Sequence, residues 1–256
     1  MRKITREPID SRTTSYLAKR QNRVNKGEIV DTAWKSARQT QTMQRVFNTL
    51  VSMAGKRVRC MYCEDSHGTD IDHYWPKADY PIKVFQWENM LLACSGCNRS
   101  KGRKFPLDEN GSPLLIDPTR DDPWDYLFFE PHTGFVVPRW DAEHEAPDPR
   151  GNATTDPEIL PLNIELVTEG RQRTVRRLQR AVSAFLNHFQ QPGTQGQAKQ
   201  DLIAAIADND DYGLLRWFFV KSGQTNEPFI RLRTQYPGIW NELVAALETG
   251  IGDRGP

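Results

Sequence analysis

The sequence predicts an α+β fold that is mostly α, and three observations support this prediction. Apolar residues recur at helical spacing between Thr32 and Met53, and again beyond residue 162. Short runs typical of strands occupy residues 70–77 and 88–94. All four cysteines fall in two C-x-x-C pairs that enclose these runs. We therefore expect a small strand–strand–helix core closed by the cysteines, with a basic arm and helix before it and a β-hairpin and helical lobe after it.

The composition is that of a globular protein. The 256-residue chain is 38% hydrophobic and 26% charged. No apolar run approaches the roughly 18 residues that a membrane span needs, and the basic N-terminus lacks the apolar segment of a secretory signal. We therefore expect a cytoplasmic protein without a membrane segment, in which paired cysteines bind a metal rather than form disulfides.

Charge is strongly segregated along the chain. Residues 1–59 contain 14 Lys/Arg and 4 Asp/Glu, whereas residues 105–161 contain 3 Lys/Arg and 13 Asp/Glu. Residues 60–104 contain six of each kind. A basic segment beside a neutral core suits a polyanion such as nucleic acid, because neutralised phosphates release their counterions. Two alternatives stay open: a solvated basic face, or pairing with the acidic segment of the same chain.

The N-terminal part is predicted to hold one helix. Residues 1–30 are polar and poorly periodic, which predicts an extended arm. The periodic residues from Thr32 to Met53 predict a helix that ends at Gly55. The stretch "KRVRC" then predicts a short strand that leads into Cys60.

After residue 104 the chain is predicted to form a hairpin, a linker and several helices. The stretch "PWDYLFFEPHTGFVVPRW" predicts a β-hairpin with Pro131 and Gly134 in its turn. Residues 138–161 are rich in Pro, Asp, Gly and Asn and predict a long loop or linker. An apolar stripe predicts a helix over 171–189, whose other positions are crowded with arginines: Arg171, Arg173, Arg176, Arg177 and Arg180. Further helices are predicted at 197–208, 211–222 and 227–248, the last interrupted near Pro237.

These observations divide the chain into four parts. We expect a basic arm and helix over 1–59, the cysteine-bounded core over 60–104, an acidic hairpin and linker over 105–161, and a helical lobe over 162–256 that docks a partner protein. The alternative for this lobe is that its helices pack against the core and complete a single globule.

The cysteine spacing predicts a structural zinc site. Structural zinc takes four Cys or His ligands in a tetrahedron, commonly from two C-x-x-C pairs. Cys60, Cys63, Cys94 and Cys97 satisfy that number. Because four thiolates leave no open position for a reactive water, any chemistry must come from other residues.

The enclosed residues resemble a known motif. "DIDHYWPK" and "ENMLLAC" predict two strands, and "SGCNRSKGRK" predicts a short helix that ends at Gly102. The pattern D-H-x-x-P, followed by N-x-L-x-x-C-x-x-C-N-x-x-K, resembles the HNH endonuclease motif in its four-cysteine form. The resemblance implies a ββα-metal core with signature positions His73, Asn89 and Asn98.

Phosphodiester hydrolysis needs a base to activate water and a cation to polarise the phosphate. His73 can accept the proton of water at neutral pH, and Asp72 and Asn98 offer the oxygen ligands that Mg²⁺ or Mn²⁺ prefers. By resemblance, Asn89 hydrogen-bonds across the loop and holds His73 in place. Four basic residues are available to contact flanking phosphates: Lys77, Arg99, Lys101 and Lys104.

Each of these residues has a simpler explanation. An isolated histidine is more often structural than catalytic, and Asn89 could be an ordinary turn residue. His67 reads as a solvent-exposed loop residue, and Trp75 and Trp87 as core. The set of Asp72, His73 and Asn98 favours catalysis because a zinc module that only binds nucleic acid or protein does not need it.

The resemblance extends beyond the motif. The opening "MRKIT", the stretch "DHYWPK…WENMLLACSGCNRSKGRKFPL" and the following "LLIDPT…DPWDYLFF…GFVVP" resemble the retron- and Septu-associated HNH nucleases, the PtuB-like proteins. This resemblance implies a role in bacterial anti-phage defence, with DNA as substrate and an SMC/ABC-type ATPase of the PtuA kind as partner. Two alternatives stay open: a non-catalytic zinc module, and an HNH nuclease that works alone.

Overall fold

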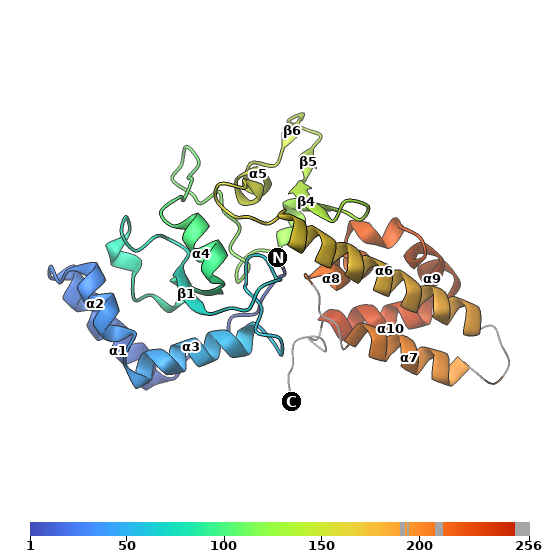
Figure 1. Cartoon of the computed structure of the whole chain (residues 1–256), viewed down its shortest axis with the longest axis horizontal. Coiled ribbons are helices and arrows are strands. Elements are labelled where there is room, and N and C mark those ends of the chain that lie inside the picture. The colour runs from blue at the N-terminus through green and yellow to red at the C-terminus, as the bar shows by residue number, and fades with distance from the viewer. Residues whose placement is uncertain (190–192, 194, 208–211, 249–256) are drawn as a thin grey trace.

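The computed structural model describes residues 1–189, 193, 195–207 and 212–248. It contains an N-terminal half with α1 to α4 and a C-terminal group of helices from α6 to α10, with the strands β3 to β6 and α5 between them (Figure 1). Mostly helical α+β architecture with small two-stranded sheets confirms the predicted class. Within the part of the chain described, no helix is long and apolar enough to cross a bilayer.

The first thirty residues are not an extended arm throughout, and that prediction is wrong for their second half. Ser11–Asn25 form helix α1, in which the Asp10 carboxylate caps the start by accepting the Thr13 amide at 2.7 Å. Leu17 and Val24 are buried on its inner face. Tertiary packing of a few apolar side chains therefore stabilises a helix whose sequence is too polar to show a clear period.

The helix predicted from Thr32 to Met53 is two helices. α2 spans Val30–Ala37 and α3 spans Gln41–Met53. Between them Thr40 is extended, and its hydroxyl accepts the Met43 amide at 3.3 Å. A threonine that caps a new helix in this way ends the preceding one, so the apolar period continues while the axis changes. The second helix ends where expected, just before Gly55.

The core follows as strand, strand and helix. β1 (Asp70–His73) pairs antiparallel with β2 (Met90–Ala93), with His73 opposite Met90, and α4 spans Ser95–Lys101. Helix α4 ends at Gly102, whose positive φ of 49° a residue with a side chain adopts reluctantly. Two short 3-10 turns, Pro81–Lys83 and Trp87–Asn89, lie in the connection between the strands. "KRVRC" forms no strand, because Arg59 makes only an isolated bridge with His67.

The predicted hairpin is present. After a 3-10 turn at Pro123–Asp125, β3 (Leu127–Glu130) pairs with β4 (Phe135–Pro138). Gly134 closes the turn with φ of 76°, and a Cβ there would lie 2.3 Å from the Thr168 carbonyl oxygen. Glycine is therefore required both by the turn and by the close approach of the next helix.

The predicted linker over 138–161 is partly structured. It contains a small hairpin of β5 (Trp140–Asp141) and β6 (Ala146–Pro147), and then helix α5 (Pro149–Thr155), which the Asp148 side chain caps. Pro149 suits the first turn of a helix, where its missing N–H costs nothing. The Pro- and Asp-rich composition thus marks a helix start as well as loops.

The C-terminal helices agree closely with the predicted ones. They are α6 (Glu165–His188), α7 (Gln195–Ala207), α8 (Leu214–Val220), a 3-10 turn (Ser222–Thr225), α9 (Phe229–Gln235) and α10 (Pro237–Glu248). The break predicted near Pro237 separates α9 from α10. Arg171 departs from the expected polar side of α6: it is buried and donates to the Gly134 carbonyl oxygen at 3.0 Å.

Candidate active site

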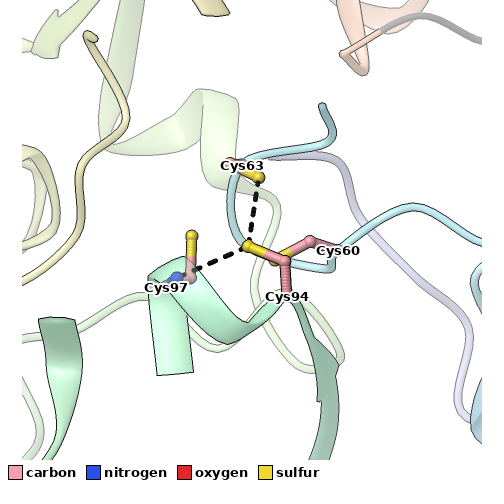
Figure 2. A group of neighbouring side chains, drawn as sticks. All are labelled: Cys60, Cys63, Cys94 and Cys97. Carbon is pink, nitrogen blue, oxygen red and sulfur yellow. Dashed lines mark hydrogen bonds between the residues drawn. The ribbon is translucent and has the colours of Figure 1, made fainter. Parts of the chain in front are cut away.

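The four cysteine side chains meet at one point (Figure 2). Their sulfur atoms all lie within 4.8 Å of one another, and all four residues are buried. Cys63 Sγ and Cys94 Sγ are 4.0 Å apart. A tetrahedron with Zn–S bonds of about 2.3 Å places its sulfurs roughly 3.8 Å apart, so this cluster fits zinc.

The charge of the cluster points the same way. Hydrogen bonds from Cys60, Cys63 and Cys97 hold the pKa of the Cys94 thiol well below its usual range. Hydrogen bonding with Cys60 lowers the pKa of the Cys63 thiol to about 6. Burial raises the pKa of the Cys60 thiol. Hydrogen bonding with the other three thiols raises the pKa of the Cys97 thiol. Two of the four adjacent thiols are thus shifted toward the thiolate, and the other two resist ionisation. A dication at the centre is what allows all four to ionise.

The first cysteine pair also reaches the end of β1. Tyr62, inside the pair, is fully buried and donates its hydroxyl to Asp72 Oδ2 at 2.7 Å. Lys101 Nζ lies 3.1 Å from the same oxygen and donates to the His73 carbonyl oxygen at 2.7 Å. Burial raises the pKa of Asp72, and the charge of Lys101 opposes this increase. Asp72 is therefore held as a buried carboxylate between the cysteine cluster and α4.

His73 is fixed from two sides. Its Nε2 is 2.9 Å from the Val84 carbonyl oxygen, and its ring lies 4.4 Å, centroid to centroid, from the edge-on ring of Trp34 on α2. Since a carbonyl oxygen only accepts, Nε2 carries the proton and Nδ1 is the basic nitrogen. Burial lowers the pKa of His73 to about 3, so the ring is neutral at physiological pH.

One cleft brings three of the predicted residues together. Asp72, His73 and Asn98 all line a cleft of about 940 Å³. Asn98 directly follows the last cysteine, is half-buried, and its side chain makes no hydrogen bond within the described residues. Helix α2 and the start of α3 form the facing side of the cleft.

Among the described residues, the Asn89 side chain makes no hydrogen bond to the histidine ring. Its side chain accepts the Trp75 amide at 2.7 Å and donates to the carbonyl oxygens of Trp75 and Lys83 at 3.1 and 3.0 Å. These bonds close the connection that carries Val84, the hydrogen-bond partner of His73. A positioning role across the loop stays a prediction for Asn89.

The four basic residues have different surroundings. Lys101 is fully buried by its pairing with Asp72, so its expected contact with phosphate is wrong for this structure. Lys77 lines the cleft but pairs with Asp31, and Lys104 donates to the Glu158 carbonyl oxygen. Arg99 is exposed and does not line the cleft.

Sequence reasoning missed the residues that hold the site. Tyr62, Trp34 and Val84 contact Asp72 or His73 from other segments of the chain. Trp34 carries no motif and lies 39 positions before His73, so only packing reveals the contact. The spacing C-x-Y-C at residues 60–63 does not indicate which way the Tyr62 side chain points.

This arrangement agrees with comparisons to known proteins. Residues 60–104 match the HNH endonuclease family model. This HNH segment holds the four cysteines, β1, β2 and α4. The resemblance expected from the motif is therefore confirmed.

Two curated proteins, both named Septu protein PtuB, are similar to part of the chain. The protein of Bacillus thuringiensis is 35% identical over 74 residues, which is 27% of this chain and 27% of that protein. The protein of Bacillus mycoides (strain KBAB4) is 31% identical over 108 residues, 30% of this chain and 36% of that protein. The matched stretches thus span about a third or less of each relative.

Proposed function

We propose that this chain is a metal-dependent HNH endonuclease that hydrolyses phosphodiester bonds of nucleic acid, with DNA as the substrate. The observation that supports this most directly is the cleft in which Asp72, His73 and Asn98 meet beside the cysteine cluster. A zinc module that only binds would not need a buried carboxylate, a neutral histidine and a free amide in one cleft.

In this proposal His73 is the general base. The Val84 carbonyl oxygen holds the proton on Nε2 and leaves Nδ1 to accept the proton of the attacking water. The edge-on contact with Trp34 prevents the ring from turning. The low pKa keeps the histidine in its basic form throughout the neutral range.

Asp72 and Asn98 would hold a divalent cation, Mg²⁺ or Mn²⁺, because both residues line the cleft and carry the oxygen ligands that such an ion prefers. When bound, such an ion polarises the phosphate and stabilises the leaving oxygen. The Tyr62 and Lys101 contacts keep the Asp72 carboxylate ionised and oriented. Cys60, Cys63, Cys94 and Cys97 would hold a structural zinc, since four sulfurs complete its coordination.

The biological setting follows from similarity. The PtuB relatives carry the name of the Septu system, and we extend to this chain a role in anti-phage defence with an SMC/ABC-type ATPase of the PtuA kind. The family-model match to an HNH endonuclease supports the nuclease part of this proposal.

The deciding experiment is a plasmid-cleavage assay with Mg²⁺ or Mn²⁺, with and without the candidate ATPase. We expect His73→Ala to lower the cleavage rate by about 10² to 10⁴, because removal of a general base has that effect. The zinc content and circular dichroism should not change. His67→Ala is the matched control, since His67 is exposed and does not line the cleft.

Two outcomes would favour the other functions. Nucleic-acid binding without cleavage under any of these conditions would indicate a non-catalytic zinc module. Full cleavage without the ATPase would indicate a nuclease that works alone. Equal cleavage by the parent and His73→Ala would contradict the assigned role of His73.

A further inference from the structure

The cleft has a second side that the HNH segment does not supply. The family-model match begins at residue 60, whereas α2 and the start of α3, from Asp31 to Phe47, line the cleft opposite β1 and α4. An inference about this side rests on the proposed nuclease function and adds a substrate contact to it.

The cations of the cleft divide into paired and unpaired ones. Lys77 pairs with Asp31, and Arg103 pairs with Asp79. Lys35 and Arg38 are exposed, line the same cleft, and make no hydrogen bond or ion pair through their side chains within the described residues. Among the cations that line the cleft, Lys35 and Arg38 are therefore the two available to bind an anionic ligand.

The carboxylates do not cancel this charge. Asp72 is paired with Lys101, and Asp31 with Lys77. Asp70, at the start of β1, is half-buried and unpaired among the described residues. Two free cations therefore face one free carboxylate, which lies on the opposite side of the cleft.

Helix α2 holds these cations in a defined place. Ala33, Trp34 and Ala37 are buried, and Trp34 contacts the His73 ring. Arg38 follows Trp34 by four positions, so it lies on the same side of the helix, and its amide donates to the Trp34 carbonyl oxygen at 2.9 Å. Arg38 therefore lies on the side of α2 that contacts the histidine, and it lines the cleft.

We propose that Lys35 and Arg38 form a second phosphate-binding side of the cleft and contact the backbone of the nucleic acid opposite His73. The neighbouring Gln39 fits this role, since it is exposed, lines the cleft and offers an amide donor, whereas the Gln44 amide donates to Asn48 Oδ1 at 3.0 Å. Trp34 is buried and Phe47 half-buried, so neither offers an exposed platform for base stacking. Contacts from α2 are therefore to phosphates and independent of base sequence.

Lys35 and Arg38 belong to the basic segment 1–59, but its cations do not all lie at the cleft. The α1 cations Arg12, Lys19, Arg20 and Arg23 do not line it. Arg20 stacks on Tyr16 and Arg23 pairs with Glu28. The basic residues that serve the cleft lie on the next helix.

The test measures DNA binding by variants made in a His73→Ala background. Binding is monitored by the fluorescence anisotropy of a fluorescein-labelled DNA duplex at several salt concentrations. We expect Lys35→Gln/Arg38→Gln to weaken binding and to reduce the slope of log K against log salt by up to about 1.8, since each phosphate contact contributes about 0.9. Both residues are exposed and glutamine favours helices, so the fold should persist.

Two further double variants serve as controls. Arg176→Gln/Arg180→Gln makes the same change of charge on exposed residues of α6, in the C-terminal group of helices, and should leave the slope unchanged (Figure 1). Arg12→Gln/Lys19→Gln removes two cations of α1 that do not line the cleft, and should reduce the slope less than the α2 variant.

Two results would overturn the inference. A slope in Lys35→Gln/Arg38→Gln equal to that of the α6 control means that α2 makes no phosphate contact. If the parent still cleaves plasmid in that case, only this inference fails and the nuclease proposal stands. If the parent protein binds neither duplex DNA nor RNA even at low salt, both fail together.

Discussion

At the scale of single residues, Lys101 connects the two parts of the site. Its ammonium group is fully buried and contacts both the Asp72 carboxylate and the His73 carbonyl oxygen. Tyr62 supplies a third contact from the cysteine pair. A buried carboxylate is stable only when paired and hydrogen-bonded, so Lys101 and Tyr62 together allow Asp72 to remain charged beside the cleft.

We therefore expect Lys101→Met or Asp72→Asn alone to lower the free energy of unfolding by about 3 to 5 kcal/mol, since each leaves a buried partner uncompensated. The double variant should lose less than the sum of the two, because the charges are removed together. Urea denaturation in buffer containing zinc measures these differences.

The control for this cycle is the exposed pair of Lys77 and Asp31. Asp31 is 82% exposed, so Lys77→Met and Asp31→Asn should each change the free energy of unfolding by only about 0 to 1 kcal/mol. Additive effects in the Asp72 and Lys101 cycle would show that the buried pair does not act as a unit.

At the scale of elements, the junction of β2 and α4 depends on one cysteine. Cys94 follows the last residue of β2, and its sulfur accepts the Cys97 amide at 3.4 Å at the start of α4. The same sulfur belongs to the four-cysteine cluster. The four-cysteine cluster and the helix that carries Asn98 and Lys101 therefore share an atom.

Cys94→Ser separates these two roles. Serine is a good helix cap but a poor zinc ligand, so the variant should keep the cap and lose the metal. We expect one zinc per chain in the parent by elemental analysis, and less zinc and a lower thermal midpoint in Cys94→Ser. A chelator should unfold the 60–104 segment of the parent, because structural zinc contributes folding free energy.

A parent protein purified without zinc would contradict this prediction. So would a Cys94→Ser variant with the thermal midpoint of the parent.

At the scale of the whole molecule, one hydrophobic core continues from the HNH segment into the C-terminal helices. Trp217 on α8 is buried against Phe129 of the hairpin, with ring centroids 5.3 Å apart. Asp122 lies 2.7 Å from Arg216 and 3.1 Å from Lys221. The four-part division of the chain stays a prediction, and a cut after residue 161 would expose the inner face of the hairpin.

Point substitutions are thus a cleaner test of the partner than truncation. Ile164 and Leu166, at the start of α6, are 50% and 70% exposed. We expect Ile164→Ser/Leu166→Ser to abolish co-elution with the SMC/ABC-type ATPase in size-exclusion chromatography with light scattering, because these exposed apolar side chains lie in the helical lobe that we expect to dock the partner.

The matched control is Ile29→Ser/Ile82→Ser, which changes two equally apolar residues, 71% and 63% exposed, in the N-terminal half. It should leave the complex intact. Two separate peaks for the parent chain and the ATPase at micromolar concentration would contradict the partnership itself.

The sequence by itself determined the four cysteines that cluster, the strands and helix of the core, the hairpin, and the break between α9 and α10. Each depends on local chemistry: C-x-x-C spacing, alternation, a glycine turn and a proline. The composition of 1–30 did not reveal α1, because its helix is stabilised by few buried side chains and by packing on the core. The apolar residues of Thr32–Met53 keep their helical spacing across the break at Thr40. Their periodicity therefore did not show that one helix ends and a second begins there.

Only the tertiary structure decided which side chains meet at the site. Lys101 matches a motif position and has the chemistry of a phosphate contact, yet packing of α4 on β1 buries it against Asp72. Trp34 and Lys35 lie before the HNH segment and have no motif, yet α2 brings one to His73 and the other to the cleft. Pairing and exposure of a charged side chain depend on neighbours that are distant in sequence, and those neighbours are set when the core closes.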